Sequence, residues 1–158
     1  LLLFHRTPAS SVIFKKMMKR MAGSRPIYAL DTPGFGASFN PGGMPDIKDY
    51  RDWFCEAIDN LGISSFHVYG HHTGTHIATE IAVHWKNRVK SLMLNGVAYL
   101  SEKERVEFGK KILPAAMPDE EGKYLMETWK IIKNLFHSCC VQASIGGSFW
   151  IAAYVSHI

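Results

Sequence analysis

The sequence predicts an α/β fold, a parallel sheet covered by helices on both faces. Four short apolar runs are bounded by turn residues: Leu1–Phe4, Pro26–Leu30, Ser64–Tyr69 and Ser91–Leu94. Segments with helical spacing of apolar residues separate these runs, so that strand and helix alternate. Alternating strands and helices form parallel sheets with right-handed crossovers. We therefore expect residues 1–99 to form one α/β core.

Three connecting helices follow from the spacing of their apolar residues. The first spans Val12–Ala22 and is closed by Gly23; the second starts after Asp46, whose side chain suits a helix cap. The buried stripe of the second helix is expected to contain Ile47, Tyr50, Phe54, Ala57, Ile58 and Leu61. The third helix begins near Gly74 and carries one apolar face of Ile77, Ala78, Ile81, Ala82 and Trp85.

Two further segments follow the core. Residues 100–133 are charged and helical in pattern, with expected breaks at Pro114 and Pro118. Residues 134–158 contain no Lys, Arg, Asp or Glu. A membrane helix needs about 20 mostly apolar residues, but the Ser, Gln, His and Gly content of this tail favours an irregular segment. We expect the tail not to pack as a sheet strand plus helix.

The composition is that of a soluble globular protein: 158 residues, 47% apolar and 20% charged, with a net charge of +4. The basic residues cluster at Lys15, Lys16, Lys19 and Arg20. No aromatic residues interleave with them, which favours a solvated helix face over a surface that binds nucleic acid or an acidic membrane. Three cysteines form no paired framework, which favours a reducing compartment and therefore the cytoplasm.

The beginning of the sequence lacks an initiating Met and the features of a secretory signal. Leu1–Phe4 instead has the pattern of a buried strand. We therefore expect the chain to begin part-way through a gene product.

The third apolar run ends in Gly70-His71-His72-Thr73-Gly74, the pattern of a nucleophile elbow. In this motif small residues allow a strand to turn sharply into a helix and hold the central side chain exposed. The central residue is His72, where Ser, Cys or Asp is usual. An imidazole there could attack an acyl carbon or take a proton from water. The alternatives are a ligand site that has lost its chemistry and a structural histidine.

Four stretches together resemble the α/β-hydrolase family. The loop His5–Ser10 is similar to the family's H-G-x-P-x-S loop, and Asp31–Ser38 to its D-x-P-G-x-G-x-S loop. The elbow and a proline-broken helical insert over residues 100–133, similar to a cap, complete the resemblance, which covers Leu1 to about Ile132. It implies that the sheet supplies the family's strands three to six and is incomplete on both sides.

The resemblance also implies roles for individual residues. His72 takes the place of the nucleophile, while the backbone N–H groups of Thr73 and Arg6 would form the oxyanion hole, with His5 and His71 beside the substrate. Arg6 stands where the family usually has Gly. The family's acid and histidine follow the nucleophile in the chain, and no credible copy of either is present. The candidates considered and set aside are Asn95, Asp119, His137 and His157.

A metal site was the remaining alternative for these histidines. His72 and His76 are four residues apart at a helix start, with His71 adjacent and His5 on a neighbouring loop. Such spacing places two imidazoles on one helix face. Because the motif contains no carboxylate or Cys ligand, we expect no metal, and the hydrolase interpretation implies no cofactor.

The sequence therefore predicts a hydrolase for a small, partly apolar, ester-like or carbonyl substrate, and leaves open that this chain is an inactive, truncated form. The alternative is a non-catalytic module that binds a small molecule on the same fold. Missing flanking strands would leave exposed sheet edges, so we also expect self-association.

Overall fold

The computed structural model describes residues 1–97, 100–116, 119–130 and 153–156. The chain divides into two units, Leu1–Ala98 with Trp150–Ile158, and Tyr99–Phe149. Each unit is described by itself below. His137 and His157, which were set aside as site residues, and the tail cysteines Cys139 and Cys140 lie outside the described residues.

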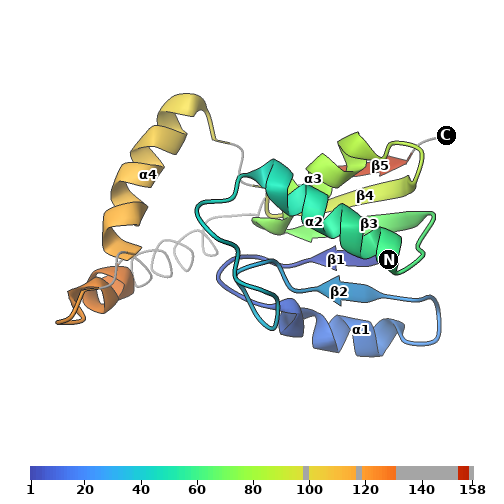
Figure 1. The fold of residues 1–158 in the computed structure, drawn as a ribbon, viewed down its shortest axis with the longest axis horizontal. Coiled ribbons are helices and arrows are strands. Elements are labelled where there is room, and N and C mark those ends of the chain that lie inside the picture. The colour runs from blue at the N-terminus through green and yellow to red at the C-terminus, as the bar shows by residue number, and fades with distance from the viewer. Residues whose placement is uncertain (98–99, 117–118, 131–152, 157–158) are drawn as a thin grey trace, which may run out of the picture. The chain divides into compact units, whose positions relative to one another are not determined.

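The first unit contains the predicted parallel sheet. Its strands are β1 (Leu2–Phe4), β2 (Tyr28–Leu30), β3 (Phe66–His71) and β4 (Val89–Asn95), and their order is β2-β1-β3-β4 (Figure 1). All three pairings between them are parallel. The first strand in the chain therefore lies inside the sheet, which confirms the predicted fold class.

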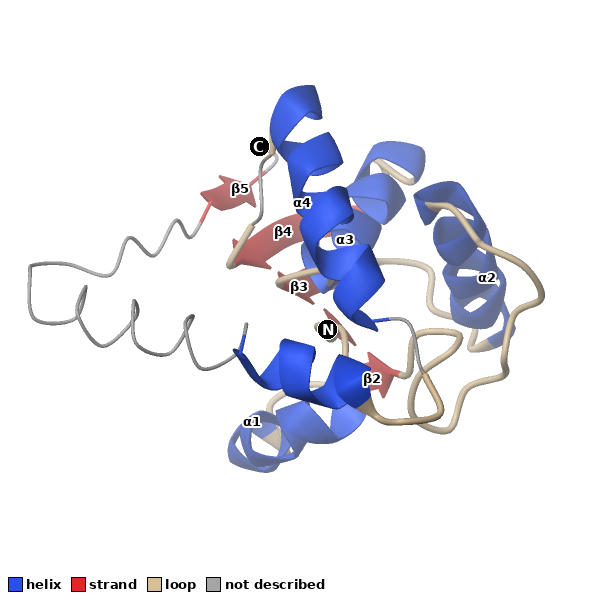
Figure 2. Ribbon diagram, turned by 90° about the vertical axis from the view of Figure 1, so that its left-hand side faces the viewer, coloured by secondary structure: helices blue, strands red, loops and turns tan. Residues whose placement is uncertain are grey.

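The crossovers place the helices on the two faces. The connection from β1 to β2 contains η1 (Ser11–Phe14) and α1 (Lys15–Met21). The next connections contain α2 (Ile47–Asn60) and α3 (Gly74–His84), and they run along the sheet in the opposite direction. Because parallel crossovers are right-handed, α1 covers one face and α2 and α3 cover the other (Figure 2).

The start of α2 confirms the predicted cap. The Asp46 carboxylate accepts the N–H groups of Lys48 (2.6 Å) and Asp49 (3.1 Å), and Asp49 accepts the N–H of Asp46 in return (2.8 Å). Three otherwise unpaired backbone donors are satisfied in this way. The predicted buried stripe is wrong at Leu61, which is 48% exposed because the helix has ended before it and Gly62 turns the chain away at φ 67°.

The core lies between the sheet and the pair α2 and α3. Phe4 packs edge to face on Phe54 with ring centroids 4.8 Å apart. The buried members of this core cluster are Leu2, Phe4, Phe54, Cys55, Ile58, Phe66, Val68, Ile77, Ala78, Ile81 and Val89. On the other face of the sheet, Met93 of β4 is 45% exposed. The two faces are thus unequally covered.

Part of the tail joins the sheet. Ala153–Ser156 forms β5, which pairs antiparallel with β4 (Leu92 opposite Val155). These residues thus form a sheet strand, whereas the rest of the tail lies outside the described residues, so the expectation that it does not pack as a strand plus helix stays a prediction. A short segment with Tyr and Val favours extended backbone, and an antiparallel edge strand needs no crossover helix.

The second unit is helical in its described part. It contains α4 (Glu102–Ala116) and a helical segment over residues 123–130. The predicted break at Pro114 is wrong, since α4 continues to Ala116. The missing N–H of a proline removes one bond of the helix, to the carbonyl four residues earlier, and α4 ends two residues after Pro114. Across the described ranges, no helix is both long and apolar enough to cross a membrane.

Candidate functional site

The carboxyl ends of the four parallel strands bring the predicted site residues to one edge of the sheet. His5 follows β1, Asp31 follows β2, His72 follows β3 and Asn95 is the last residue of β4. Ligands of open α/β sheets bind at this edge. The topology alone therefore collects loops that are distant in the sequence.

The two glycines of the elbow are required by close packing. A Cβ on Gly70 would lie 2.6 Å from the carbonyl oxygen of Gly74, and one on Gly74 would overlap the carbonyl of Phe4. Real Cβ atoms do not approach backbone so closely. The turn from β3 into α3 can therefore be this close only with glycine at both positions, and a larger residue would displace the backbone.

His72 is held at the apex of this turn. Its φ of 53° lies in the left-handed region, and it is the one non-glycine residue in the described chain with positive φ. Its N–H donates to the carbonyl of Asn95 (2.8 Å), and its own carbonyl accepts from the N–H (2.9 Å) and hydroxyl (2.5 Å) of Thr75. The side chain is exposed. The backbone is thus fixed while the imidazole is presented to solvent, as the elbow pattern predicts.

Thr73 links the elbow to the loop after β1. Its hydroxyl oxygen accepts from the N–H (2.7 Å) and the hydroxyl (3.1 Å) of Thr7. These bonds fix the backbone next to Arg6, whose side chain is exposed, against the N-terminus of α3. Free N–H groups and the helix dipole favour negative charge at such a position. Thr7 was missed in the sequence, because nothing local marks a bond across 66 residues.

His5 has a structural place. It is 1% exposed, its Nε2 accepts the N–H of Thr32 (2.9 Å), and its Nδ1 lies 2.9 Å from the carbonyl of Arg6. An accepting Nε2 requires the Nδ1–H tautomer, so the ring is neutral and both nitrogens are occupied. The carboxylate of Asp31, 4.0 Å away, consequently forms no ion pair with it. His5 joins two loops and is not open to a substrate.

His71 is half-buried beside the elbow, opposite Asn95 in the sheet. Its Nδ1 is buried and has no hydrogen-bond partner among the described residues. Burial first, and then the nearby charges of Arg6 and His72, lower the pKa of His71 below the ordinary value, against a smaller opposing effect of the Asn95 backbone. The ring is therefore held neutral at neutral pH, with its buried Nδ1 unpaired among the described residues.

Asp31 organises the loop after β2. Its carboxylate oxygens accept the N–H groups of Ser11 (2.6 Å) and Ala37 (2.8 Å). Burial raises the pKa of Asp31, but these hydrogen bonds outweigh it and the net shift is downward. A side chain on Gly36 would overlap the carboxylate, and Gly36 has φ 60°. The Asp and Gly of this motif are thus needed to build the loop.

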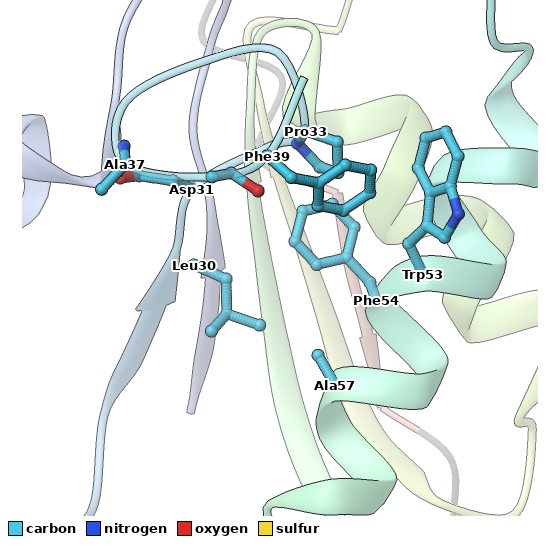
Figure 3. A pocket seen from close by; sticks show the side chains of 9 residues that line it. Leu30, Asp31, Pro33, Ala37, Phe39, Trp53, Phe54 and Ala57 are labelled. Carbon is cyan, nitrogen blue, oxygen red and sulfur yellow. The ribbon is translucent and has the colours of Figure 1, made fainter. Parts of the chain in front are cut away.

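Of the cavities lined by described residues, those of about 380 and 420 Å³ contain none of His5, Arg6, His71, His72 and Thr73. The first, about 380 Å³, lies between the Asp31 loop and α2 (Figure 3). Phe39 and Trp53 form an edge-to-face pair on its rim, with centroids 5.3 Å apart. The second, about 420 Å³, lies at the amino ends of the parallel strands and includes His67 and Lys90.

The histidines do not form a metal centre in the described part of the chain. No group of three or more His, Cys, Asp or Glu side chains there is arranged to hold an ion. The site is therefore an exposed imidazole beside a helix N-terminus, with a neutral histidine and a cationic loop residue nearby.

Comparison with known proteins identifies the family. The model of the alpha/beta hydrolase fold matches residues 1–132. An uncharacterized hydrolase of Saccharomyces cerevisiae is 33% identical over 104 residues, 63% of this chain and 35% of the yeast protein. The 1-acylglycerol-3-phosphate O-acyltransferase of Homo sapiens is 32% identical over 75 residues, 45% of this chain and 22% of its own.

A solved structure of the same fold superposes on this chain. The haloalkane dehalogenase from Bradyrhizobium elkani superposes with a TM-score of 0.64 at 25% identity, over 73% of this chain and 44% of the dehalogenase. The chain thus spans about a third or less of the two curated relatives and under half of the solved one. The matched range contains the whole sheet edge described above, and the chain belongs to the alpha/beta hydrolase fold family.

Proposed function

We propose that this chain carries the acyl-transfer site of a hydrolase for a small, partly apolar, ester-like substrate, with His72 as the reacting group. The imidazole attacks the acyl carbon, the alcohol leaves, and water then hydrolyses the acyl-imidazole to release the acid. In the alternative route the imidazole takes a proton from the water that attacks. Both routes convert ester and water into acid and alcohol, and neither requires a cofactor.

The observation that carries this proposal is the conformation of His72. A left-handed, hydrogen-bonded backbone with an exposed side chain is a strained arrangement, and such strain persists where the surrounding structure imposes it. The N-terminus of α3 supports the proposal, since the N–H groups of Thr73 and Arg6 could both donate hydrogen bonds to a developing oxyanion. The guanidinium of Arg6 would hold a carboxylate on the substrate.

The surroundings of the His72 ring determine which esters we expect the chain to hydrolyse. In the residues that the structure describes, no hydrogen bond or ion pair reaches the His72 imidazole. Nothing there orients the ring or shares its proton, in contrast to a catalytic triad. We therefore expect hydrolysis of activated esters with good leaving groups, and little turnover of alkyl esters.

A second candidate function is binding without turnover. Asn95 stands at the end of β4, where some members of the family place their acid, and its amide donates to the hydroxyl of Tyr69 (2.8 Å). An amide cannot supply the negative charge that stabilises an imidazolium. This observation favours a module that binds a ligand without turnover. For either function we propose the cytoplasm as the location.

The experiment compares esterase activity of the 158-residue chain with that of His72→Ala and His72→Ser, using nitrophenyl esters of short acids. General acid–base groups contribute typically 10²–10⁴-fold, so His72→Ala should lower turnover by about a hundredfold or more. His72→Ser should remain inactive, because serine needs a base that this part of the chain does not supply.

The matched control is His84→Ala, which removes another exposed histidine, at the end of α3. It corrects for ester hydrolysis by any surface imidazole and should leave turnover unchanged. Equal turnover by the wild type and both His72 variants would show that the elbow carries no chemistry. Thermal stabilisation by short carboxylates or esters without turnover would then favour the binding module.

A further inference from the structure

The outer surface of η1 and α1 is both basic and apolar. Val12 is 69% exposed and Ile13 40% exposed, and all four basic residues of the segment are exposed. With 3.6 residues per helical turn, these side chains fall on about half of the circumference. We call this surface the basic face; its members are Val12, Ile13, Lys15, Lys16, Lys19 and Arg20. The opposite half contains buried Phe14 and half-buried Met17, Met18 and Met21, which lie toward the sheet.

The positive charge of the basic face is not neutralised. Neither η1 nor α1 has an acidic residue in its first turn, and their sequences contain none at all. No ion pair involves the four cations within the described ranges. Asp31 contacts the start of η1, but its carboxylate is occupied by the N–H groups of Ser11 and Ala37.

The exposed aliphatic residues decide which polyanion fits. A nucleic acid would neutralise the cations but leave Val12 and Ile13 in water, and the basic face offers no aromatic ring for base stacking. An anionic lipid surface satisfies both features, because lysines bind headgroup phosphates while aliphatic side chains enter the boundary with the acyl chains. Since no described helix can cross a membrane, such binding would be peripheral.

We propose that the basic face docks this chain on anionic lipid membranes. The inference is independent of the chemistry at His72, because it rests on η1 and α1 alone. The sequence favoured a solvated helix face; the structure adds the exposure of Val12 and Ile13, which depends on how η1 is set against the sheet.

The test is flotation of the 158-residue chain with phosphatidylcholine vesicles, with and without phosphatidylserine. Vesicle-bound protein rises in a density gradient, whereas aggregated protein sinks. The wild type should float with the anionic vesicles alone, and less at high salt. Circular dichroism of every variant confirms that the exposed substitutions leave the fold intact.

Two variants of equal net charge distinguish binding through the basic face from attraction that depends only on the net charge of the chain. The first combines Lys15→Gln, Lys16→Gln, Lys19→Gln and Arg20→Gln. The control combines Lys48→Gln, Lys86→Gln, Lys103→Gln and Lys110→Gln, all exposed and outside the basic face. Each basic residue near an anionic surface contributes roughly fivefold to partitioning, so the first variant should bind at least about a hundredfold more weakly, and the control far less so.

A third variant tests the aliphatic part of the face. Val12→Ser with Ile13→Ser keeps every charge and should weaken vesicle binding by roughly tenfold or more. Equal flotation of the basic-face variant and its control would overturn the proposal. A second outcome would also overturn it: the wild type does not bind anionic vesicles but binds duplex or single-stranded nucleic acid, and the Val12 and Ile13 changes do not affect that binding. The partner would then be a nucleic acid.

Discussion

Two histidines of β3, His67 and His71, have pKa values below the ordinary imidazole value of 6.5. For His71 the cause is burial, followed by repulsion from Arg6 and His72; for His67 it is burial, followed by Arg25. The ring of His71 already has one buried nitrogen without a partner, and protonation would bury a charge as well. These two rings therefore link the stability of the sheet to pH.

The first prediction concerns this link. The imidazole of His71 binds a proton more tightly in the unfolded chain than in the folded one. Its contribution to the free energy of unfolding is therefore complete above pH 6.5 and is lost as the pH falls through the lowered pKa. The free energy of unfolding should therefore decrease on acidification from neutral pH, before the carboxylates titrate. Denaturant unfolding at several pH values measures this slope, and His71→Gln should reduce it.

His84→Gln provides the control, since it makes the same change at an exposed position of α3. His67→Gln should remove a further part of the slope. An identical pH dependence for the wild type and the double variant of His67 and His71 would contradict the assignment.

At the scale of elements, the strand–turn–helix unit of β3 and α3 depends on glycines that touch backbone. The second prediction is that Gly74→Ala lowers the free energy of unfolding by about 1–3 kcal/mol, the usual cost of overpacking, because the new Cβ would overlap the carbonyl of Phe4. Thermal or denaturant unfolding measures it. Gly42→Ala is the matched change, since a Cβ there meets nothing within 4 Å and the residue has no positive φ.

Gly42→Ala should be neutral or slightly stabilising, because alanine restricts the unfolded chain. Should Gly74→Ala prove as harmless as Gly42→Ala, β1 and α3 would not be packed as closely as described.

Local signals in the sequence were enough for these elements. Gly70 and Gly74 mark the elbow, and Asp46 and Asp49 mark the start of α2, because the physical requirement lies within a few residues. Long-range contacts could not be read in this way. The bond from Thr7 to Thr73 and the two bonds of His5 depend on how three loops meet at the sheet edge. His5 was therefore expected near a substrate, but it is a buried residue whose hydrogen bonds connect two loops.

On the scale of the whole sheet, the face that carries α1 is less covered than the face that carries α2 and α3. Tyr69 of this face packs against Phe14 with centroids 5.8 Å apart, while its neighbour Met93 remains 45% exposed. β2 is an edge strand with pairing on one side in the described sheet. An exposed strand edge next to an apolar surface is a template for association.

The third prediction is that the 158-residue chain self-associates with increasing concentration, as measured by sedimentation velocity. Met93→Lys should weaken the association because it places a charge on the less covered face. Met44→Lys makes the same change on a loop where the side chain is already 95% exposed, and should have little effect. A sharp monomer at all concentrations, or an equal response to both changes, would contradict this account.

The strand order has a consequence for synthesis on the ribosome. β1 is made before β2 and β3 but lies between them, and Leu2 pairs with Tyr28 and Val68. At about 5–20 residues per second, β1 remains without its second neighbour for on the order of several seconds. During this interval its three fully apolar residues, buried in the finished sheet, are available to chaperones that bind nascent chains. Translation speed between β2 and β3, through residues 31–65, therefore sets how long this buried strand lacks its second neighbour.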